Sequence, residues 1–164
     1  MKNRIQRRDF LRTAAVAGIG LGMTSMSQML FANDTAQKKI RIGIIGLSVH
    51  TEAFSEMLNA EVVDADISGF RVVAIYHPKG NPDVEFKAEM LADWAVKAKG
   101  RGIELVDSVD KMLAMSDVVM LETNDGRPHM EQLLPVFKAG KPVFIDKPIG
   151  ANLKEVVQIL NAAK

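Results

Sequence analysis

Lys39–Phe54, KIRIGIIGLSVHTEAF, is the stretch that decides the expected fold. The apolar, β-branched run from Ile40 to Gly46 is typical of a strand covered on both faces. From Thr51 to Ala60 the apolar spacing becomes helical, and the expected inner face is Ala53, Phe54, Met57 and Leu58. A buried strand that runs through a tight turn into a helix predicts the first βα unit of a nucleotide-binding sheet, with the turn as the place for a pyrophosphate.

Downstream of this unit, strand and helix patterns alternate to the last residue. Strands are expected at residues 70–76, 103–106, 118–121 and 143–145. Helices are expected at residues 85–99, after Asp107 or Ser108, from Pro128 to Gly140, and after Asn152, which with Glu155 resembles a capping box. The expected inner faces of the longer helices are Met90, Leu91, Trp94 and Ala98, then Met130, Leu133, Leu134 and Phe137, then Leu153, Val156, Val157 and Leu160. The alternation predicts an α/β fold with a doubly wound, Rossmann-like parallel sheet.

The ligand crevice of such a sheet lies beyond the carboxyl ends of its strands, beside the first strand. Four turns are expected to converge there: residues 46–51, 76–80, 122–129 and 146–150. Candidate functional residues are therefore sought in these four turns.

The first turn departs from the dinucleotide fingerprint G-x-G-x-x-G. The six aligned residues are Gly46, Leu47, Ser48, Val49, His50 and Thr51, so the first glycine alone is present. The Ser48 side chain could crowd a phosphate or donate a hydrogen bond to it, and the helix start suits an anion in either case. The pattern leaves two interpretations open, a cofactor turn or a plain strand-to-helix turn. For the first, the predicted contacts are Gly46, Leu47, Ser48, His50 and Thr51.

The end of the second strand, Tyr76-His77-Pro78-Lys79, lacks the acidic residue that commonly holds the ribose hydroxyls of NAD. Lys79 or Arg71 could meet a ribose phosphate, which would favour NADP, although a solvated loop lysine is the commoner case. We expect Tyr76 near the cofactor, and the choice between NAD and NADP stays open.

Residues 122–129, ETNDGRPH, place several polar side chains at a strand end and a helix start. Turn and capping chemistry accounts for most of them, but not for Glu122, Arg127 and His129 together at a crevice mouth. Cofactor contacts are predicted here for Thr123, Asn124, Asp125 and His129.

Asp146-Lys147-Pro148 follows the fifth strand, so Lys147 is expected at the crevice. A buried lysine there can serve as a proton donor or as an electrostatic partner of a hydroxyl that is oxidised. The alternative is a surface salt bridge between Lys147 and Asp146. Asp146 and Pro148 are also predicted to contact the cofactor.

Several other classes of site are disfavoured by the sequence. The chain has no cysteine, and His50, His77 and His129 are far apart without a His-x-x-x-His pair, so no metal site is predicted. It also has no nucleophile elbow and no Walker lysine. Beyond residue 32 there are 16 basic and 19 acidic residues, which gives no indication of nucleic-acid binding.

The first 32 residues read as an export signal of the twin-arginine type. Arg7 and Arg8 precede Phe10 and Leu11, and a modest apolar run follows at residues 13–23, well short of the roughly 20 residues that a membrane span needs. We expect cleavage after Ala32, a linker at residues 33–38, and a periplasmic or other extracytoplasmic location. The alternative is a basic amphipathic helix or an anchor.

The chain from Lys39 to Lys164 resembles the N-terminal domain of the Gfo/Idh/MocA family, which includes glucose-fructose oxidoreductase and inositol dehydrogenase. The resemblance rests on RIGIIGL at residues 41–47, on HMEQLLPVFKAGKPVFIDKP at residues 129–148, and on the export signal, which some members share. The family marks this strand end with Glu-Lys-Pro and uses its lysine at the active site. The resemblance therefore implies that Lys147 is catalytic, that the cofactor is NAD or NADP, and that the substrate is sugar-like.

The resemblance also implies parts that are not in this sequence. Relatives continue into a sixth strand and a C-terminal α/β domain that supplies further catalytic residues. The expectation is thus an incomplete nucleotide-binding domain of an exported oxidoreductase. Two alternatives are a non-catalytic binding module that keeps the Rossmann scaffold and an inactive gene fragment. The oligomeric state is not predicted.

Overall fold

The computed structural model describes residues 38–164. The predicted export signal, its cleavage site after Ala32 and most of the predicted linker lie outside these residues.

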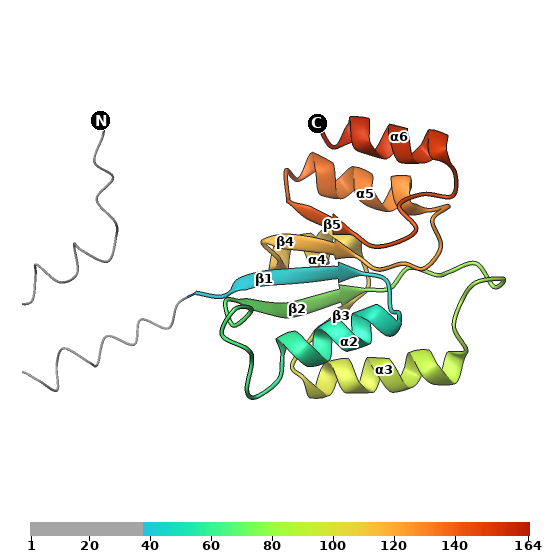
Figure 1. Ribbon diagram of the computed structural model, residues 1–164. Helices are drawn as coiled ribbons and strands as arrows, with labels where there is room; N and C mark the ends of the chain where they lie inside the picture. Colours follow the sequence, from blue (N-terminus) through green and yellow to red (C-terminus); the bar gives the residue numbers. More distant parts are fainter. Residues whose placement is uncertain (1–37) are drawn as a thin grey trace, which may run out of the picture. The chain divides into compact units, whose positions relative to one another are not determined.

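The described residues form one parallel sheet of five strands (Figure 1). The strands are β1 (Ile40–Ile45), β2 (Phe70–Tyr76), β3 (Glu104–Val106), β4 (Val118–Leu121) and β5 (Val143–Ile145). Their order is β3-β2-β1-β4-β5, so the direction in which strands are added reverses between β1 and β4. The predicted doubly wound sheet is confirmed, and its switch point lies beside β1 as expected.

Helices cover both faces of the sheet (Figure 1). On one face, α2 (Val49–Leu58) and α3 (Ala88–Gly100) cover a core that includes Ile44, Val72 and Ile75. On the other, α4 (Val109–Met115), α5 (His129–Lys138) and α6 (Leu153–Ala162) cover a core that includes Ile45, Val119 and Leu121. No helix within residues 38–164 is long and apolar enough to cross a membrane.

The predicted inner faces of α2 and α6 are partly wrong. Helix α2 buries Thr51, Ser55 and Leu58, whereas Ala53 and Met57 are exposed. Helix α6 buries Ile159 and exposes the predicted Leu153, Val157 and Leu160, because it packs mainly against α5 and only Ile159 joins the core of that face. Met90 of α3 and Leu134 of α5 are also exposed. An apolar stripe gives the period of a helix, but two neighbouring stripes can share that period, and packing decides between them.

Side chains at the amino ends of the strands fasten the sheet away from the crevice. The Arg41 guanidinium donates to Asp117 at 2.7 Å and so ties the start of β1 to the start of β4. Asn59, which follows α2, accepts from the Val72 N–H at 3.0 Å and donates to the Val72 carbonyl at 2.9 Å. These contacts leave the carboxyl ends of the strands as the open edge.

Candidate functional site

The turn after β1 is built on Gly46. Its φ of 103° lies in the left-handed region, and a Cβ there would lie 2.5 Å from the backbone nitrogen of Thr123. The Gly46 N–H donates to the Tyr76 carbonyl at 2.8 Å. Since neither the conformation nor the space admits a side chain, the retained first glycine is required by the fold.

Ser48 and Thr51, which stand where the fingerprint has glycines, are parts of the helix start. Ser48 is the N-cap of α2, and its Oγ accepts from the Thr51 N–H at 3.2 Å. The Thr51 hydroxyl donates to the Gly46 carbonyl at 3.1 Å. Both side chains are buried and bonded inside the unit, and Ser48 also lines the cavity that contains His50 and Lys147.

The Thr51 side chain is fully buried, and its contact with a cofactor stays a prediction. The third fingerprint position normally lets a helix approach a strand closely. Here a hydrogen bond from the Thr51 hydroxyl to the Gly46 carbonyl connects the helix to the strand instead.

A cavity of about 150 Å³ lies on one side of the turn. It is lined by residues of the first three predicted turns, among them Gly46, Leu47, His77, Lys79 and Asn124. The Leu47 N–H donates to Nδ1 of His77 at 3.2 Å, which requires that nitrogen to be unprotonated. Burial lowers the pKa of His77 and outweighs the opposing effect of Glu85.

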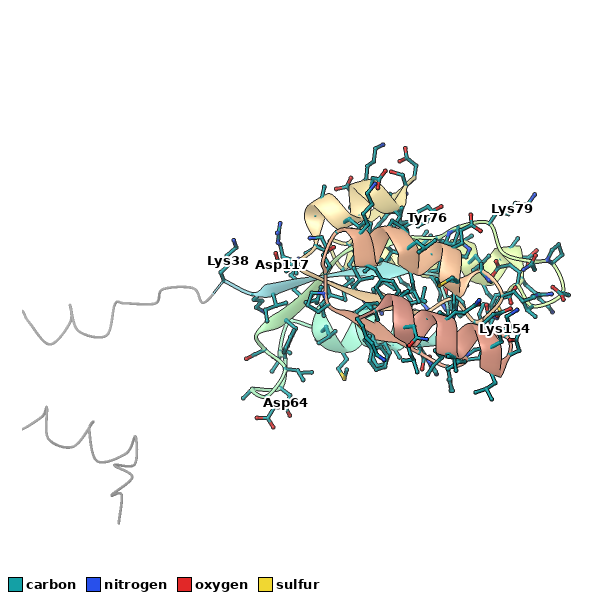
Figure 2. The ribbon with its side chains drawn as sticks, turned by 90° about the horizontal axis from the view of Figure 1, so that it is seen from above. Lys38, Asp64, Tyr76, Lys79, Asp117 and Lys154 are labelled. Carbon is teal, nitrogen blue, oxygen red and sulfur yellow. The ribbon has the colours of Figure 1, made fainter. Side chains whose placement is uncertain are left out.

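The two basic residues considered for a ribose phosphate lie at opposite ends of the sheet. Arg71 is in register with Arg41 at the start of the strands, so it is far from the cavity, whereas Lys79 lines it. Figure 2 shows Lys79 at the opposite end of the ribbon from Lys38 and Asp117. Tyr76 is half-buried against the core and is not among the residues that line this cavity.

The loop after β4 is bonded to the loop after β2. Asn124 donates to the Val84 carbonyl at 2.6 Å, and Arg127 forms ion pairs with Asp83 and Asp125, both at 2.8 Å. Asp125 is 6% exposed and also accepts from Asn81. The Arg127 guanidinium holds the pKa of Asp125 far below its usual range. The Asp125 carboxylate thus joins the two loops. Asp125 also lines the first cavity, and its contact with the cofactor stays a prediction.

The imidazole of His129 is also fully buried, and its predicted cofactor contact likewise stays untested. Its Nε2 lies 2.8 Å from the Thr123 carbonyl oxygen and its Nδ1 lies 3.1 Å from the Ile149 carbonyl oxygen. The ring thus joins the loop after β4 to the loop after β5 and leaves no free nitrogen for a ligand.

On the other side of the turn, four ionisable side chains converge on a second cavity of about 220 Å³. They are His50 of α2, Glu122 after β4, and Asp146 and Lys147 after β5. Nδ1 of His50 contacts Oδ2 of Asp146 and lies 4.0 Å from Oε2 of Glu122. Nζ of Lys147 lies 3.4 Å from Nε2 of His50 and 3.7 Å from Oδ2 of Asp146.

The environment of this cluster perturbs both carboxyl groups. Burial, reinforced by the negative charge of Asp146, raises the pKa of Glu122 to about 8. Burial would also raise the pKa of Asp146, but hydrogen bonds from His50 and from the Lys147 backbone outweigh it and lower that pKa. Two neighbouring carboxyl groups with pKa values pushed apart are typical of a functional site.

Lys147 itself is exposed rather than buried, since 76% of its side chain is accessible. Pro148, joined to it by a cis peptide bond, is exposed as well. Nζ of Lys147 lies 3.7 Å from Asp146, as the salt-bridge interpretation predicts. The same ammonium also faces the second cavity.

Sequence reasoning missed the metal-ligand types that gather here. His50, Glu122 and Asp146 each offer one ligand atom, and these atoms lie within 4.8 Å of one another. The prediction of no metal site was based on spacing along the chain. These three residues follow three different strands, β1, β4 and β5, and only the order of the strands in the sheet brings them together. Glu85, which lines the first cavity, was missed for the same reason.

Residues 40–164 match the family model of the Gfo/Idh/MocA proteins, an oxidoreductase family with an NAD-binding Rossmann fold. Over 101 residues the chain is 29% identical to an inositol 2-dehydrogenase of Gluconacetobacter diazotrophicus, an alignment that covers 61% of this chain and 27% of that protein.

Two solved structures show a similar fold. Apo scyllo-inositol dehydrogenase of Lactobacillus casei is 25% identical with a TM-score of 0.55, and the match covers 77% of this chain and 33% of that one. The WlbA dehydrogenase of Bordetella pertussis, solved with NADH and UDP-GlcNAcA, is 21% identical with a TM-score of 0.56, and the match covers 76% of this chain and 34% of that one. This chain thus spans between a quarter and about a third of the length of these relatives.

Proposed function

Because this chain belongs to the Gfo/Idh/MocA family of oxidoreductases with an NAD-binding Rossmann fold, we propose that it binds a nicotinamide dinucleotide, NAD or NADP, at the turn after β1. In the whole protein this domain would serve hydride transfer to or from a sugar or polyol. The inositol dehydrogenases among the relatives support that substrate class.

The conformation of the Gly46 turn is the observation that carries the proposal. A backbone without a side chain lies next to the first turn of α2, where the Thr51 N–H is capped by Ser48 and the N–H groups of Val49 and His50 come too early in the helix to have an intrahelical partner. Positive φ and N–H groups at a helix start suit a pyrophosphate. Ser48 is turned into the helix cap, so its replacement of glycine does not block the approach.

The nicotinamide would supply or accept the hydride, and this chain's own residues would handle binding and the proton. The start of α2 would hold the pyrophosphate beside the backbone of Gly46 and Leu47, whose own N–H groups are bonded to Tyr76 and His77, while Lys79 and His77 line the cavity on the ribose side. Nζ of Lys147 faces the second cavity and would take the proton from a substrate hydroxyl that is oxidised, or give a proton to the oxygen of a carbonyl that is reduced. His50 and Asp146 lie within 3.7 Å of that nitrogen and would hold it in place.

Titration of the purified chain with NADH and with NADPH, followed by cofactor fluorescence, tests the proposal. We expect saturable binding of at least one of them, and we expect Gly46→Ala to weaken it because the new Cβ meets the Thr123 backbone. Gly69→Ala is the matched control, since a Cβ there has no neighbour within 4 Å. No saturation by either dinucleotide up to about 1 mM, which corresponds to about 4 kcal/mol of binding free energy, would reject the proposal.

We also propose that the protein is exported by the twin-arginine route, on the basis of Arg7, Arg8, Phe10 and Leu11 and the short apolar run after them. Changing both arginines to lysine should keep the protein inside the cytoplasm of a host that has this route. Recovery of the double variant from the periplasmic fraction at the wild-type level would count against export by this route.

A further inference from the structure

We propose that His50, Glu122 and Asp146 form a binding site for a first-row divalent cation, of the Mn²⁺ or Zn²⁺ type, at the edge of the second cavity. The proposal does not depend on dinucleotide binding, although two of its ligands, His50 and Asp146, also lie beside Nζ of Lys147.

The geometry suits one shared ion. One nitrogen and two carboxylate oxygens lie within 4.8 Å of one another. Ligands bonded to one first-row ion at about 2.0–2.2 Å lie at most about 4.4 Å apart, so a small movement of the side chains brings all three atoms onto one ion. Nδ1 of His50 already contacts Asp146, and the imidazole is 40% exposed, so it has room to move aside for an ion.

Glu122 gives the second, independent indication. It is 2% exposed, and within the described residues neither of its carboxylate oxygens has a hydrogen-bond partner. A buried carboxylate without a partner is costly. A cation shared with Asp146 and His50 would take the place of the proton on Glu122, bind one of its oxygens and offset the charge of the two carboxylates.

The donor set also limits the kind of ion. Imidazole nitrogen suits first-row transition metals, carboxylate oxygen suits Mn²⁺ as well, and the chain has no thiolate to favour softer ions. Three protein ligands leave coordination positions open toward the cavity, where water or an oxygen of a small ligand could bind. The cavity also admits the ion, because His50 and Lys147 at its mouth are accessible.

The test uses the tag-free, chelator-treated chain, because a histidine tag would bind the same ions. Mn²⁺ binding is followed by the loss of the free-ion electron paramagnetic resonance signal, and Zn²⁺ binding by titration calorimetry. We expect one ion per chain, and we expect Glu122→Gln and Asp146→Asn each to lower the affinity at least about tenfold. Both substitutions keep the shape of the side chain, and circular dichroism verifies that the variants fold.

Glu85→Gln is the matched control. Glu85 lies 3.9 Å from His77 in the first cavity and forms a carboxylate–histidine pair without a third ligand, so its loss should leave cation affinity unchanged. Lys147→Met should keep or tighten binding, since it removes a positive charge 3.7 Å from Asp146. Absence of binding below about 1 mM of either ion would overturn the proposal, as would equal affinities of the wild type, Glu122→Gln and Asp146→Asn.

Discussion

His77 shows at the residue scale how one ring nitrogen can fix a turn. Its Nδ1 accepts the Leu47 N–H, and this bond is lost when the ring takes up a proton there. Burial accordingly lowers the pKa of His77 in the folded protein. The tertiary structure, rather than any local motif, makes this histidine part of the candidate cofactor cavity.

Stability should therefore depend on pH through His77. Because the folded pKa lies below the unfolded value of about 6.5, the unfolded chain binds the proton first as the pH falls. The contribution of His77 is present above about pH 6.5 and is lost as the pH falls through the folded pKa. Urea unfolding of the wild type and of His77→Gln between about pH 7.5 and pH 5 checks this. The wild type should lose more stability, and equal losses would contradict the assignment.

Lys79 and Arg71 are the two basic residues considered for binding the ribose phosphate of NADP. If the cofactor is NADP, Lys79→Ala should weaken NADPH binding about tenfold, which corresponds to the loss of one charge-assisted hydrogen bond. NADH binding should change much less. Arg71→Ala is the matched control, because Arg71 lies at the start of β2 and should affect neither cofactor. Equal effects of Lys79→Ala on both cofactors would mean that Lys79 attracts both by its charge and does not bind the ribose phosphate of NADP.

The start of α2 is the informative feature at the scale of elements. Ser48 and Thr51 look like losses from a glycine fingerprint, but they cap the helix and bond it to the Gly46 carbonyl. The hydroxyls replace what the glycines would supply by close approach. In the sequence, Ser48 and Thr51 therefore look like lost glycines. In the structure they form the hydrogen bonds that hold the start of α2.

Restoring both glycines should consequently destabilise the protein. Ser48→Gly with Thr51→Gly removes the cap, a buried hydroxyl bond and helix propensity, and we expect a loss of about 1–2 kcal/mol in the free energy of unfolding. Chemical denaturation measures the loss, and an NADH titration of the same variant shows whether affinity rises despite it. An unchanged unfolding midpoint would mean that these hydroxyls contribute little to the helix start.

At the scale of the whole molecule, binding and stability should be coupled. A dinucleotide that binds only the folded domain, present at about 100 times its dissociation constant, should stabilise the protein by about 2.7 kcal/mol. A thermal unfolding series with increasing NADH and NADPH measures this. The shift should disappear in Gly46→Ala and persist in Gly69→Ala. A shift that is equal in both variants would indicate binding elsewhere on the molecule.

Much of the fold could be predicted because strands and helices of this size have strong local signals. The apolar runs at β4 and β5 gave the bounds observed, and alternation of the two periods implied the parallel sheet. Asn152 was also predicted correctly as the cap of α6, where its side chain accepts from the Glu155 N–H at 3.1 Å. Inner faces were predicted less well, because the side of a helix that is buried depends on what packs against it.

The sequence by itself determined the order of the elements, the turn at Gly46 and the place of Lys147 at a strand end, because these follow from the spacing of neighbouring residues. The tertiary structure alone decided that His129 and Asp125 hold loops together, and that Glu122 lies buried beside His50 and Asp146. Those contacts join residues up to 96 positions apart. Only the strand order β3-β2-β1-β4-β5, which places β4 and β5 beside β1, brings such residues within bonding distance.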